Sequence, residues 1–336
     1  MLNFATIGTS WITSQMIEAA RLTQHYHLKA VHSRHLDKAK QFQQDHGADY
    51  YTTDISTLLY DPEIQVVYIA TPNSTHVDYA LQAVEAKKHV IIEKPMFTSS
   101  AQWHQVYDLA QENQVRIFEA ALHYHSRNYS RLRPLIKQKI ESCQQPVMGA
   151  NFNIGQYSSK YEAYLEAREN GWQVPNVFSA TYAGGSLMDL GVYPLYIAID
   201  LFGMPQTVRY HAINDGQKID LFGTIVLTYA KFQVTIFVSK AVHSILASEI
   251  YVGEETFVID NISRIDKAKL VNKQGESVQL INYLPANPMY DELMTFAEVI
   301  QSPGDIHHEV RYENWRQLSL QVTQVMDLLR QSAKLI

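Results

Sequence analysis

The stretch that decides the fold is His89-Val90-Ile91-Ile92-Glu93-Lys94-Pro95-Met96, an apolar run that ends in Glu-Lys-Pro. A short apolar run of this kind is typical of a buried strand. Its charged residues therefore fall at the carboxyl end, where open α/β sheets bind ligands. Pro95 ends the strand and favours extended backbone at Lys94. Lys94 is the first candidate for chemistry, although a lysine at a strand end can also simply extend into water.

Short apolar strands alternate with helical patterns through the first third of the chain. The strands are expected over residues 2–7, 28–33, 65–70, 89–92 and 116–119, with a helix over 100–112 before the last of them. Such alternation indicates a parallel sheet with crossover helices. We predict an α/β fold with a doubly wound Rossmann domain over residues 1–122.

The pattern changes after a helix expected near 130–141. Strands joined by short polar turns are expected over residues 147–157, 206–213, 221–230, 232–240, 248–253, 256–260, 267–272 and 277–281. This spacing predicts a large, open, mainly antiparallel sheet in a second α/β domain, residues 123–336. Two helices, near 289–301 and 311–332, end the chain, and the apolar face of the second predicts packing against the first domain.

Composition and charge narrow the class of protein. The 336 residues carry a formal net charge of −6 and no basic run, so we expect no nucleic-acid partner. The single cysteine, Cys143, excludes an intrachain disulfide, fits a reducing compartment and has no neighbours typical of a reactive site. No run approaches 18 apolar residues and no basic leader begins the chain, so the sequence predicts a cytoplasmic protein without a membrane partner.

A glycine follows the first strand at the point where a phosphate-binding turn would lie. The turn reads Gly8-Thr9-Ser10-Trp11-Ile12-Thr13, with Ser10 and Thr13 where a dinucleotide-binding G-x-G-x-x-G motif has its other glycines. Backbone amides and the following helix N-terminus would face a pyrophosphate. The alternative is a plain strand-to-helix turn capped by Thr9 or Ser10.

The second strand ends in Val31-His32-Ser33-Arg34, where an NAD-specific site usually has an acid against the ribose 2′-hydroxyl. Ser33 and Arg34 instead offer a hydroxyl and a guanidinium, which suit a 2′-phosphate. NADP(H) is therefore favoured as cofactor and NAD(H) stays possible, because an exposed arginine at a helix start also occurs without any ligand.

Three separated motifs occur in order along the chain: Thr71-Pro72-Asn73-Ser74-Thr75-His76, Glu93-Lys94-Pro95 and the stretch Gly184-Gly185-Ser186-Leu187-Met188-Asp189-Leu190-Gly191-Val192-Tyr193. Together they resemble the Gfo/Idh/MocA family of glucose-fructose oxidoreductases and inositol dehydrogenases, over nearly the whole chain. The resemblance implies a Rossmann domain followed by an open α/β domain that often forms the oligomer interface. We therefore expect a homodimer or a dimer of dimers.

The resemblance also implies which residues bind the cofactor. These are Gly8, Thr9, Ser10, Trp11 and Ile12 at the pyrophosphate, Ser33 and Arg34 at the adenosine ribose, Thr71, Asn73 and His76 along the inner edge, and Glu93 and Lys94 at the nicotinamide. Local structure offers alternatives, since Asn73 or Ser74 could cap a helix and His76 could be a solvated first-turn residue.

One position departs from the usual family pattern, which has histidine where this chain has Tyr193. That change, together with Glu119-Ala120, resembles the branch of dihydrodiol dehydrogenases and 1,5-anhydrofructose reductases. The next residues, Leu122-His123-Tyr124-His125, differ from that branch and leave the substrate open. Spacing of i, i+4 would place Asp189 and Tyr193 on one helix face, but Pro194 disfavours helical backbone at Tyr193.

The chemistry implied is hydride transfer between nicotinamide and a carbinol or carbonyl carbon of a sugar, inositol or diol. A proton must move on the substrate oxygen, and Lys94 is the predicted donor and acceptor, with Tyr193 assisting and Asp189 orienting hydroxyls. Two alternatives are a redox-assisted glycosidase and a nucleotide-binding sensor without catalysis.

Further side chains invite a role. His123 and His125 lack the additional ligands of a metal site, so no metal is expected and we place them at the substrate pocket. The aromatic residues Tyr157, Tyr161, Tyr164 and Trp172 could cover a sugar ring or pack at a domain edge.

Overall fold

The computed structural model describes residues 1–142, 147–216 and 218–336, which leaves Cys143 outside the described residues. The chain divides into two compact units. The first consists of Met1–Ala121 with Pro285–Gln317, and the second of Leu122–Leu284 with Leu318–Ile336.

A six-stranded sheet, parallel throughout, forms the centre of the first unit. Its order is β3-β2-β1-β4-β5-β6. The strands are β1 (Leu2–Ile7), β2 (Tyr26–His32), β3 (Tyr50–Thr52), β4 (Val66–Ile69), β5 (His89–Glu93) and β6 (Ile117–Ala120). This is the strand order of a dinucleotide-binding Rossmann fold, so the predicted fold class is confirmed. The sequence did not predict β3, a three-residue edge strand.

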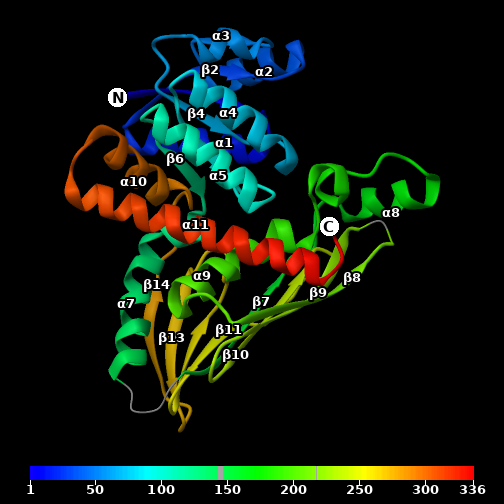
Figure 1. Ribbon diagram of the computed structural model, residues 1–336, viewed down its shortest axis with the longest axis vertical. Coiled ribbons are helices and arrows are strands. Elements are labelled where there is room, and N and C mark those ends of the chain that lie inside the picture. Colours follow the sequence, from blue (N-terminus) through cyan, green and yellow to red (C-terminus); the bar gives the residue numbers. More distant parts are fainter. Residues whose placement is uncertain (143–146, 217) are drawn as a thin grey trace. The chain divides into compact units, whose positions relative to one another are not determined.

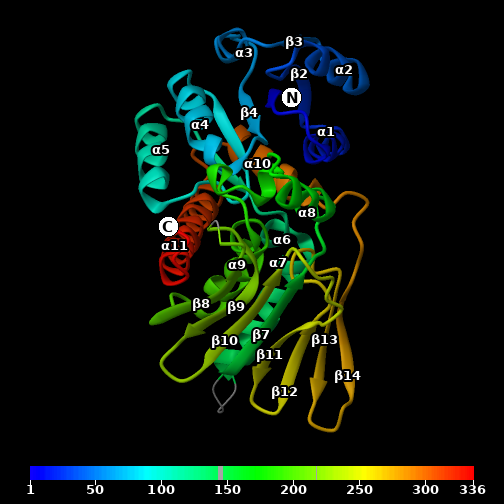
Figure 2. The same ribbon diagram turned by 90° about the vertical axis from the view of Figure 1, so that its right-hand side faces the viewer.

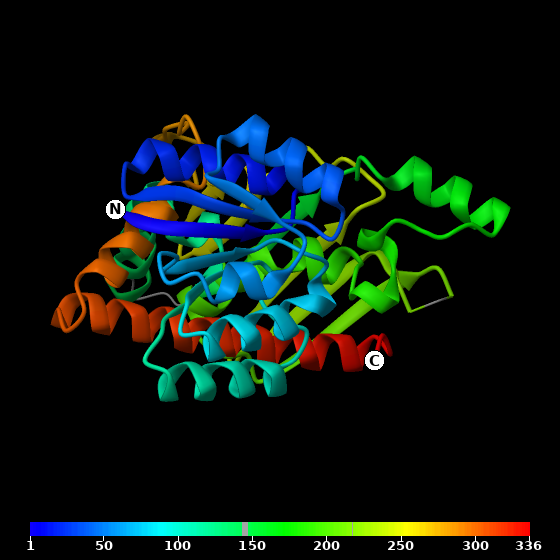
Figure 3. The same cartoon turned by 90° about the horizontal axis from the view of Figure 1, so that it is seen from above.

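Helices cover both faces of this sheet. They are α1 (Trp11–Thr23), α2 (Leu36–His46), α3 (Ile55–Leu59), the 3₁₀ turn η1 (Asn73–Thr75), α4 (His76–Glu85), α5 (Ser100–Glu112) and α10 (Tyr290–Gln301). Figure 3 shows the blue helices α1 and α2 on one side of the strands and the cyan-to-teal α4 and α5 on the other. Right-handed crossovers that leave β1 and β4 in opposite directions require this arrangement.

Residues 285–317 belong to the first unit through buried contacts. The Tyr26 hydroxyl donates to the Leu293 carbonyl at 3.0 Å, and the Ile117 amide donates to the Tyr312 hydroxyl at 3.0 Å. Phe118 of β6 stacks on Phe296 of α10 with ring centroids 4.6 Å apart. The final helix, α11 (Ile306–Ser332), begins in this unit and ends in the other.

The second unit contains an eight-stranded sheet in the order β14-β13-β12-β11-β7-β10-β9-β8. Its strands are β7 (Val147–Gly155), β8 (Thr207–Asn214), β9 (Asp220–Thr228), β10 (Gln233–Ser239), β11 (Ser248–Val252), β12 (Glu255–Ile259), β13 (Lys267–Asn272) and β14 (Ser277–Asn282). Neighbours are antiparallel apart from the pair β7 and β10, which is parallel. The predicted mainly antiparallel sheet is therefore confirmed.

Helices lie on one face of this sheet. They include α6 (Leu122–His125), α7 (Arg127–Ser142) and α9 (Val192–Phe202), while α8 (Tyr161–Asn170) stands at the end of β7. Figure 1 shows α7 beside β14, and α9 packs on β7. Figure 2 shows the strands of this sheet side by side in order from β8 to β14. Strand β10 alternates accordingly, with Val234, Ile236 and Val238 buried and Thr235 and Phe237 half-buried on the other face.

Helix α9 corrects one expectation. Tyr193 is helical, because a π-helical segment, Leu187–Gly191, continues directly into α9, and Pro194 is the third residue of that helix. Pro194, which has no N–H to donate, stands where the π-helical turn gives way to the α-helix and the backbone hydrogen-bond pattern changes. The restriction on the preceding residue is overcome here by burial, since Val192, Pro194 and Leu195 are all buried.

Among the described residues, one stretch of 23 residues, Ala180–Phe202, meets the length and hydropathy of a membrane span. It is 72% buried inside the protein, as a core helix would be, so this is weak support for a span.

Candidate active site

The turn after β1 has the shape that phosphate binding requires. Gly8 has φ +114°, and a Cβ at this position would lie 2.4 Å from the Ala70 carbonyl oxygen, so any side chain would collide with the backbone. The Gly8 amide donates to the His32 carbonyl at 3.2 Å. Gly8 is the one glycine of the G-x-G-x-x-G pattern that this sequence keeps, and no other residue fits at its position.

The N-terminus of α1 follows this turn. Ser10 occupies the N-cap, but its hydroxyl contacts the Thr13 hydroxyl at 3.2 Å instead of capping a backbone N–H of the helix. N–H groups of a first helical turn and the helix dipole together attract anions. A pyrophosphate therefore fits the residues present, although Trp11, 72% exposed, stands beside it with a large side chain.

The end of β2 presents no carboxylate. Ser33 is buried, its amide donates to the Thr52 carbonyl at 3.3 Å, and its hydroxyl accepts from the His35 amide at 3.3 Å. Arg34 is exposed immediately before α2. A hydroxyl and a mobile guanidinium at this point suit an anionic group on the ribose.

His76 is the first residue of α4, but it is not solvated. It is fully buried, with Nε2 2.8 Å from the Thr71 carbonyl and Nδ1 3.2 Å from the carbonyls of Pro95 and Met96. Burial lowers the pKa of His76, and the charge of Lys94 acts in the same direction. His76 thus joins the Thr71 turn to the Glu-Lys-Pro turn from inside the protein.

The carboxyl end of β5 is held by two further contacts. Glu93 accepts a hydrogen bond from the buried Tyr68 hydroxyl at 2.6 Å, and burial raises the pKa of Tyr68 well above its usual value. Glu119 of β6 accepts from the Met96 amide at 3.0 Å. The partly buried Lys94 lies in the chain between Glu93 and Met96, so its backbone is fixed on both sides.

In the second unit, the glycine-rich motif closes around a buried acid. Asp220 Oδ2 accepts from the Leu187 amide and the Tyr210 hydroxyl, each at 2.6 Å. A Cβ on Gly185 would lie 2.0 Å from Asp220 Oδ1. Burial raises the pKa of Asp220 to about 6, against the lowering effect of these hydrogen bonds.

Asp189, which the sequence predicts to be functional, forms an ion pair with Lys240. The Lys240 side chain is only 3% exposed, whereas that of Asp189 is 36% exposed. The Asp189 side chain is therefore partly accessible, whereas its cationic partner is buried.

Tyr193 is supported by His123. His123 is buried, and its Nε2 lies 3.0 Å from the Tyr193 carbonyl, which can only accept, so Nε2 carries a proton. The His123 ring also packs edge-on against the Tyr193 ring at 4.9 Å. His123 thus fixes the start of α9, while His125 packs against Tyr124 at 5.2 Å.

The aromatic residues before the motif divide into two groups. Tyr161 and Tyr164 pack with Phe178 in a buried cluster, and the Tyr164 hydroxyl donates to Asp215 at 3.0 Å. Trp172 is 65% exposed and Tyr157 43% exposed. Packing accounts for the first pair, and only the second pair is accessible.

Sequence reasoning missed Lys240, Asp220 and Tyr68. Lys240 follows the buried strand β10 directly, the same signal that singled out Lys94. Asp220 begins a strand and looked like a turn residue, and Tyr68 lies inside an apolar run. Within the described residues, no group of three or more His, Cys, Asp or Glu side chains could hold a metal ion.

Comparison with known proteins agrees with this geometry. Residues 2–121 match the oxidoreductase family with an NAD-binding Rossmann fold, GFO_IDH_MocA, and residues 154–257 match the GFO/IDH/MocA C-terminal domain. The chain belongs to the Gfo/Idh/MocA family of oxidoreductases, as its motifs predict. It is an NAD(P)-dependent oxidoreductase that acts on CH–OH or carbonyl groups.

Two relatives match over most of their length. The uncharacterized oxidoreductase YgjR of Escherichia coli K12 is 35% identical over 300 residues, 89% of this chain and 88% of its own. The scyllo-inositol 2-dehydrogenase (NADP(+)) IolU of Bacillus subtilis 168 is 30% identical over 336 residues, 100% of this chain and 98% of its own.

A solved structure shares the fold. It is KijD10, a 3-ketoreductase from Actinomadura kijaniata in complex with NADP and TDP-benzene, with a TM-score of 0.82 at 18% identity. The match covers 98% of this chain and 97% of that one.

Proposed function

We propose that this protein transfers hydride between NADP(H) and a carbinol or carbonyl carbon of a sugar, inositol or diol, with NAD(H) as a poorer cofactor. The observation that carries the proposal is that β2 ends in Ser33-Arg34 without an acid, while Asp189 offers a partly exposed acidic side chain. IolU, whose name records NADP⁺ and scyllo-inositol, supports both parts.

The residues proposed to hold the cofactor form three groups on the first unit. The Gly8–Ile12 turn and the start of α1 would bind the pyrophosphate, Ser33 and Arg34 the ribose phosphate, and Thr71, Asn73 and Glu93 the inner half. His76 would act from behind, because it is buried. When bound, the nicotinamide supplies the carbon that gives or takes the hydride.

Proton transfer is assigned to Lys94. In oxidation, the substrate carbon loses a hydride, its C–O single bond becomes a carbonyl, and a neutral Lys94 amine accepts the hydroxyl proton; in reduction the ammonium returns it. Tyr193 would assist through its hydroxyl. Asp189 would accept hydrogen bonds from neighbouring substrate hydroxyls, because an ionised carboxylate only accepts.

The proposal is tested with Lys94→Met on a substrate found by screening sugars, inositols and diols with NADP⁺. We expect turnover to fall by at least about a hundredfold, within the usual contribution of acid–base catalysis, with NADPH affinity within a few-fold of wild type. An exposed lysine of α2 provides a control, Lys38→Met, which should retain full turnover. Normal turnover of Lys94→Met combined with loss in Tyr193→Phe would exchange the two roles.

A cytoplasmic homodimer or dimer of dimers is proposed as the working form. The half-buried face of the eight-stranded sheet, which carries Phe237, Tyr251 and Val258, supports a contact between copies, since unpaired apolar surface of this kind usually marks an interface. The single cysteine is consistent with a reducing compartment. Light scattering at micromolar concentration should show a dimer or tetramer, and a monomer would refute the interface.

A further inference from the structure

Lys240 is a buried basic residue to which the proposed chemistry assigns no role. It directly follows β10, at the carboxyl end of that strand. Its side chain is 3% exposed and pairs with Asp189. Its Nζ also lies 5.2 Å from the centre of the Phe178 ring, where an aromatic face attracts a cation.

The backbone of Lys240 is fixed by contacts to three elements. Its amide lies 3.0 Å from the Leu221 carbonyl and 3.1 Å from the Ser186 hydroxyl. Its carbonyl accepts from the Ser158 amide at 2.9 Å. Ser186, in the glycine-rich motif, itself donates to the Leu221 carbonyl at 2.5 Å. The backbone of Lys240 and the segment that carries Asp189 are therefore linked by one hydrogen-bond network through Ser186 and Leu221.

The two charges differ in their access to water. An ammonium that is almost fully buried depends on its partner, because an unpaired buried charge strongly destabilises a protein. A carboxylate that is 36% exposed can still be solvated without the ammonium. The pair therefore constrains the Asp189 side chain from its buried side, while that side chain stays partly exposed.

We propose that Lys240 is a positioning residue that holds the Asp189 carboxylate aimed at substrate hydroxyls. This inference rests on the proposed function of Asp189 and adds a substrate requirement. The subsite accepts hydrogen bonds, so it selects a neutral group with O–H donors and disfavours a phosphate or carboxylate at that position. Lys240 itself does not touch the substrate in this account.

Steady-state kinetics on the confirmed polyol substrate test the inference. Lys240→Met should lower kcat/KM by about 10- to 100-fold, the usual effect of removing an outer partner that orients a site residue. The loss should lie mainly in KM, whereas Lys94→Met acts on kcat. Lys240→Arg, which keeps the charge, should recover part of the loss.

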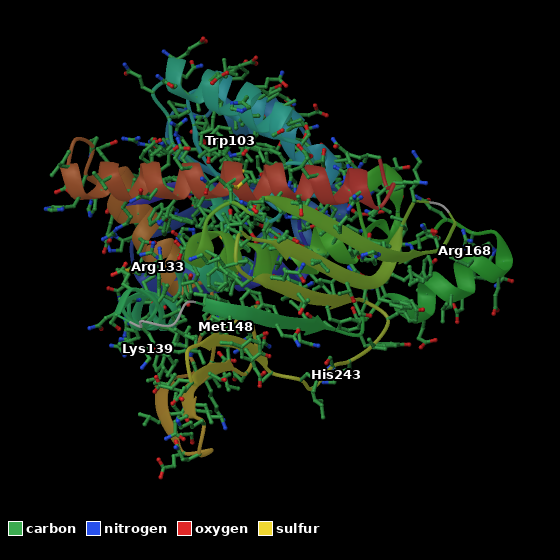
Figure 4. The ribbon with its side chains drawn as sticks, turned by 60° about the horizontal axis from the view of Figure 1, so that its bottom comes forward. Trp103, Arg133, Lys139, Met148, Arg168 and His243 are labelled. Carbon is green, nitrogen blue, oxygen red and sulfur yellow. The ribbon has the colours of Figure 1, made fainter. Side chains whose placement is uncertain are left out.

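The matched control is Lys139→Met. Lys139, in the last turn of α7, also pairs with a carboxylate of the same unit, Glu255, but its side chain is 33% exposed. Figure 4 labels Lys139. Its removal should leave both kinetic constants unchanged. NADPH affinity should stay within a few-fold of wild type in every variant, which shows that the proteins are folded.

Thermal unfolding supplies a readout that does not depend on turnover. Asp189→Asn removes the ion-pair partner of the buried ammonium, so its melting temperature should fall below that of Lys240→Met. The double variant Asp189→Asn/Lys240→Met should melt above Asp189→Asn alone. In kinetics, the double variant should be no worse than Asp189→Asn, because both changes remove the same interaction.

Several results would overturn the inference. These are unchanged kcat/KM in Lys240→Met, a loss in kcat with KM unaltered, or additive losses in the double variant. If Lys240→Met fails to fold, Lys240→Arg and the double variant decide in the same way. If wild type transfers no hydride with any polyol, the proposed function fails, whereas a failure of Lys240 alone leaves wild-type turnover and the Lys94→Met effect intact.

Discussion

At the scale of single residues, buried ionisable side chains lie in places that the sequence motifs do not mark. Glu292 of α10 is 1% exposed, and within the described part of the chain neither of its carboxylate oxygens has a hydrogen-bond partner. Burial raises the pKa of Glu292 well above its usual value, and the nearby charge of Glu93 adds to this. Folding therefore favours the protonated form of Glu292.

A pH dependence of stability follows. The unfolded chain releases the Glu292 proton above about pH 4.5, while the folded protein retains it to higher pH, so the free energy of unfolding falls as pH rises above that value. Glu292→Gln removes this contribution. Urea denaturation between about pH 5 and pH 8 should show a flatter pH dependence for the variant than for wild type.

Glu298→Gln is the control for this prediction, because Glu298 lies on the same helix, is 41% exposed and pairs with Arg311 at the surface. Its pH dependence should match that of wild type. Equal slopes for Glu292→Gln and wild type would mean that Glu292 is ionised in the folded state.

The same scale shows what the sequence could predict of the site. Gly8, Ser33-Arg34, Asp189 and Lys94 stand in recognisable motifs at the ends of apolar runs. Lys240 and Asp220 do not, because each is buried with a partner brought from far along the chain: Asp220 meets Leu187 and Lys240 meets Asp189. Glu292 is buried by packing alone, and no motif marks it.

At the scale of elements, apolar runs predicted the strands well, since the residues of β1, β4 and β5 are largely buried from both faces. The short edge strand β3 has no buried residue and hence no hydrophobic signal. Pro194 argued against helical backbone at Tyr193, but it lies where a π-helical turn continues into α9, and no local pattern predicts such a turn.

The glycine-rich segment gives a prediction at this scale. Gly185 has φ +105°, and the methyl group of Gly185→Ala would collide with Asp220. The Asp220 carboxylate would then move away from the Leu187 amide. We expect the free energy of unfolding to fall by at least about 2 kcal/mol more than in Gly171→Ala, in line with the cost of overpacking. Gly171, with φ +70° and nothing within 4 Å, should cost only about 1–2 kcal/mol.

Denaturant unfolding of both variants measures this difference, and turnover should fall in Gly185→Ala only. Equal losses in the two variants would show that Asp220 does not constrain the motif.

At the scale of the whole molecule, the protein combines a Rossmann unit with an antiparallel sheet unit, and the predicted catalytic residues are divided between them. Lys94 belongs to the first unit, and Asp189 and Tyr193 to the second. The alternation of strands and helices, followed by strands joined by short turns, predicted a parallel Rossmann sheet and a mainly antiparallel sheet. No local pattern could predict the order of eight strands, which depends on pairings such as that of β7 with β10.

We propose that the end of β2 selects NADP(H) over NAD(H) as the cofactor of this enzyme, and calorimetric titration measures this selection. NADPH should bind more tightly than NADH to wild type, and Arg34→Ala should reduce that ratio, whereas Lys40→Ala, an exposed change on the same helix α2, should leave it unaltered. An unchanged ratio in Arg34→Ala would contradict the 2′-phosphate assignment. Absence of binding by either nucleotide up to about 1 mM would contradict the whole account.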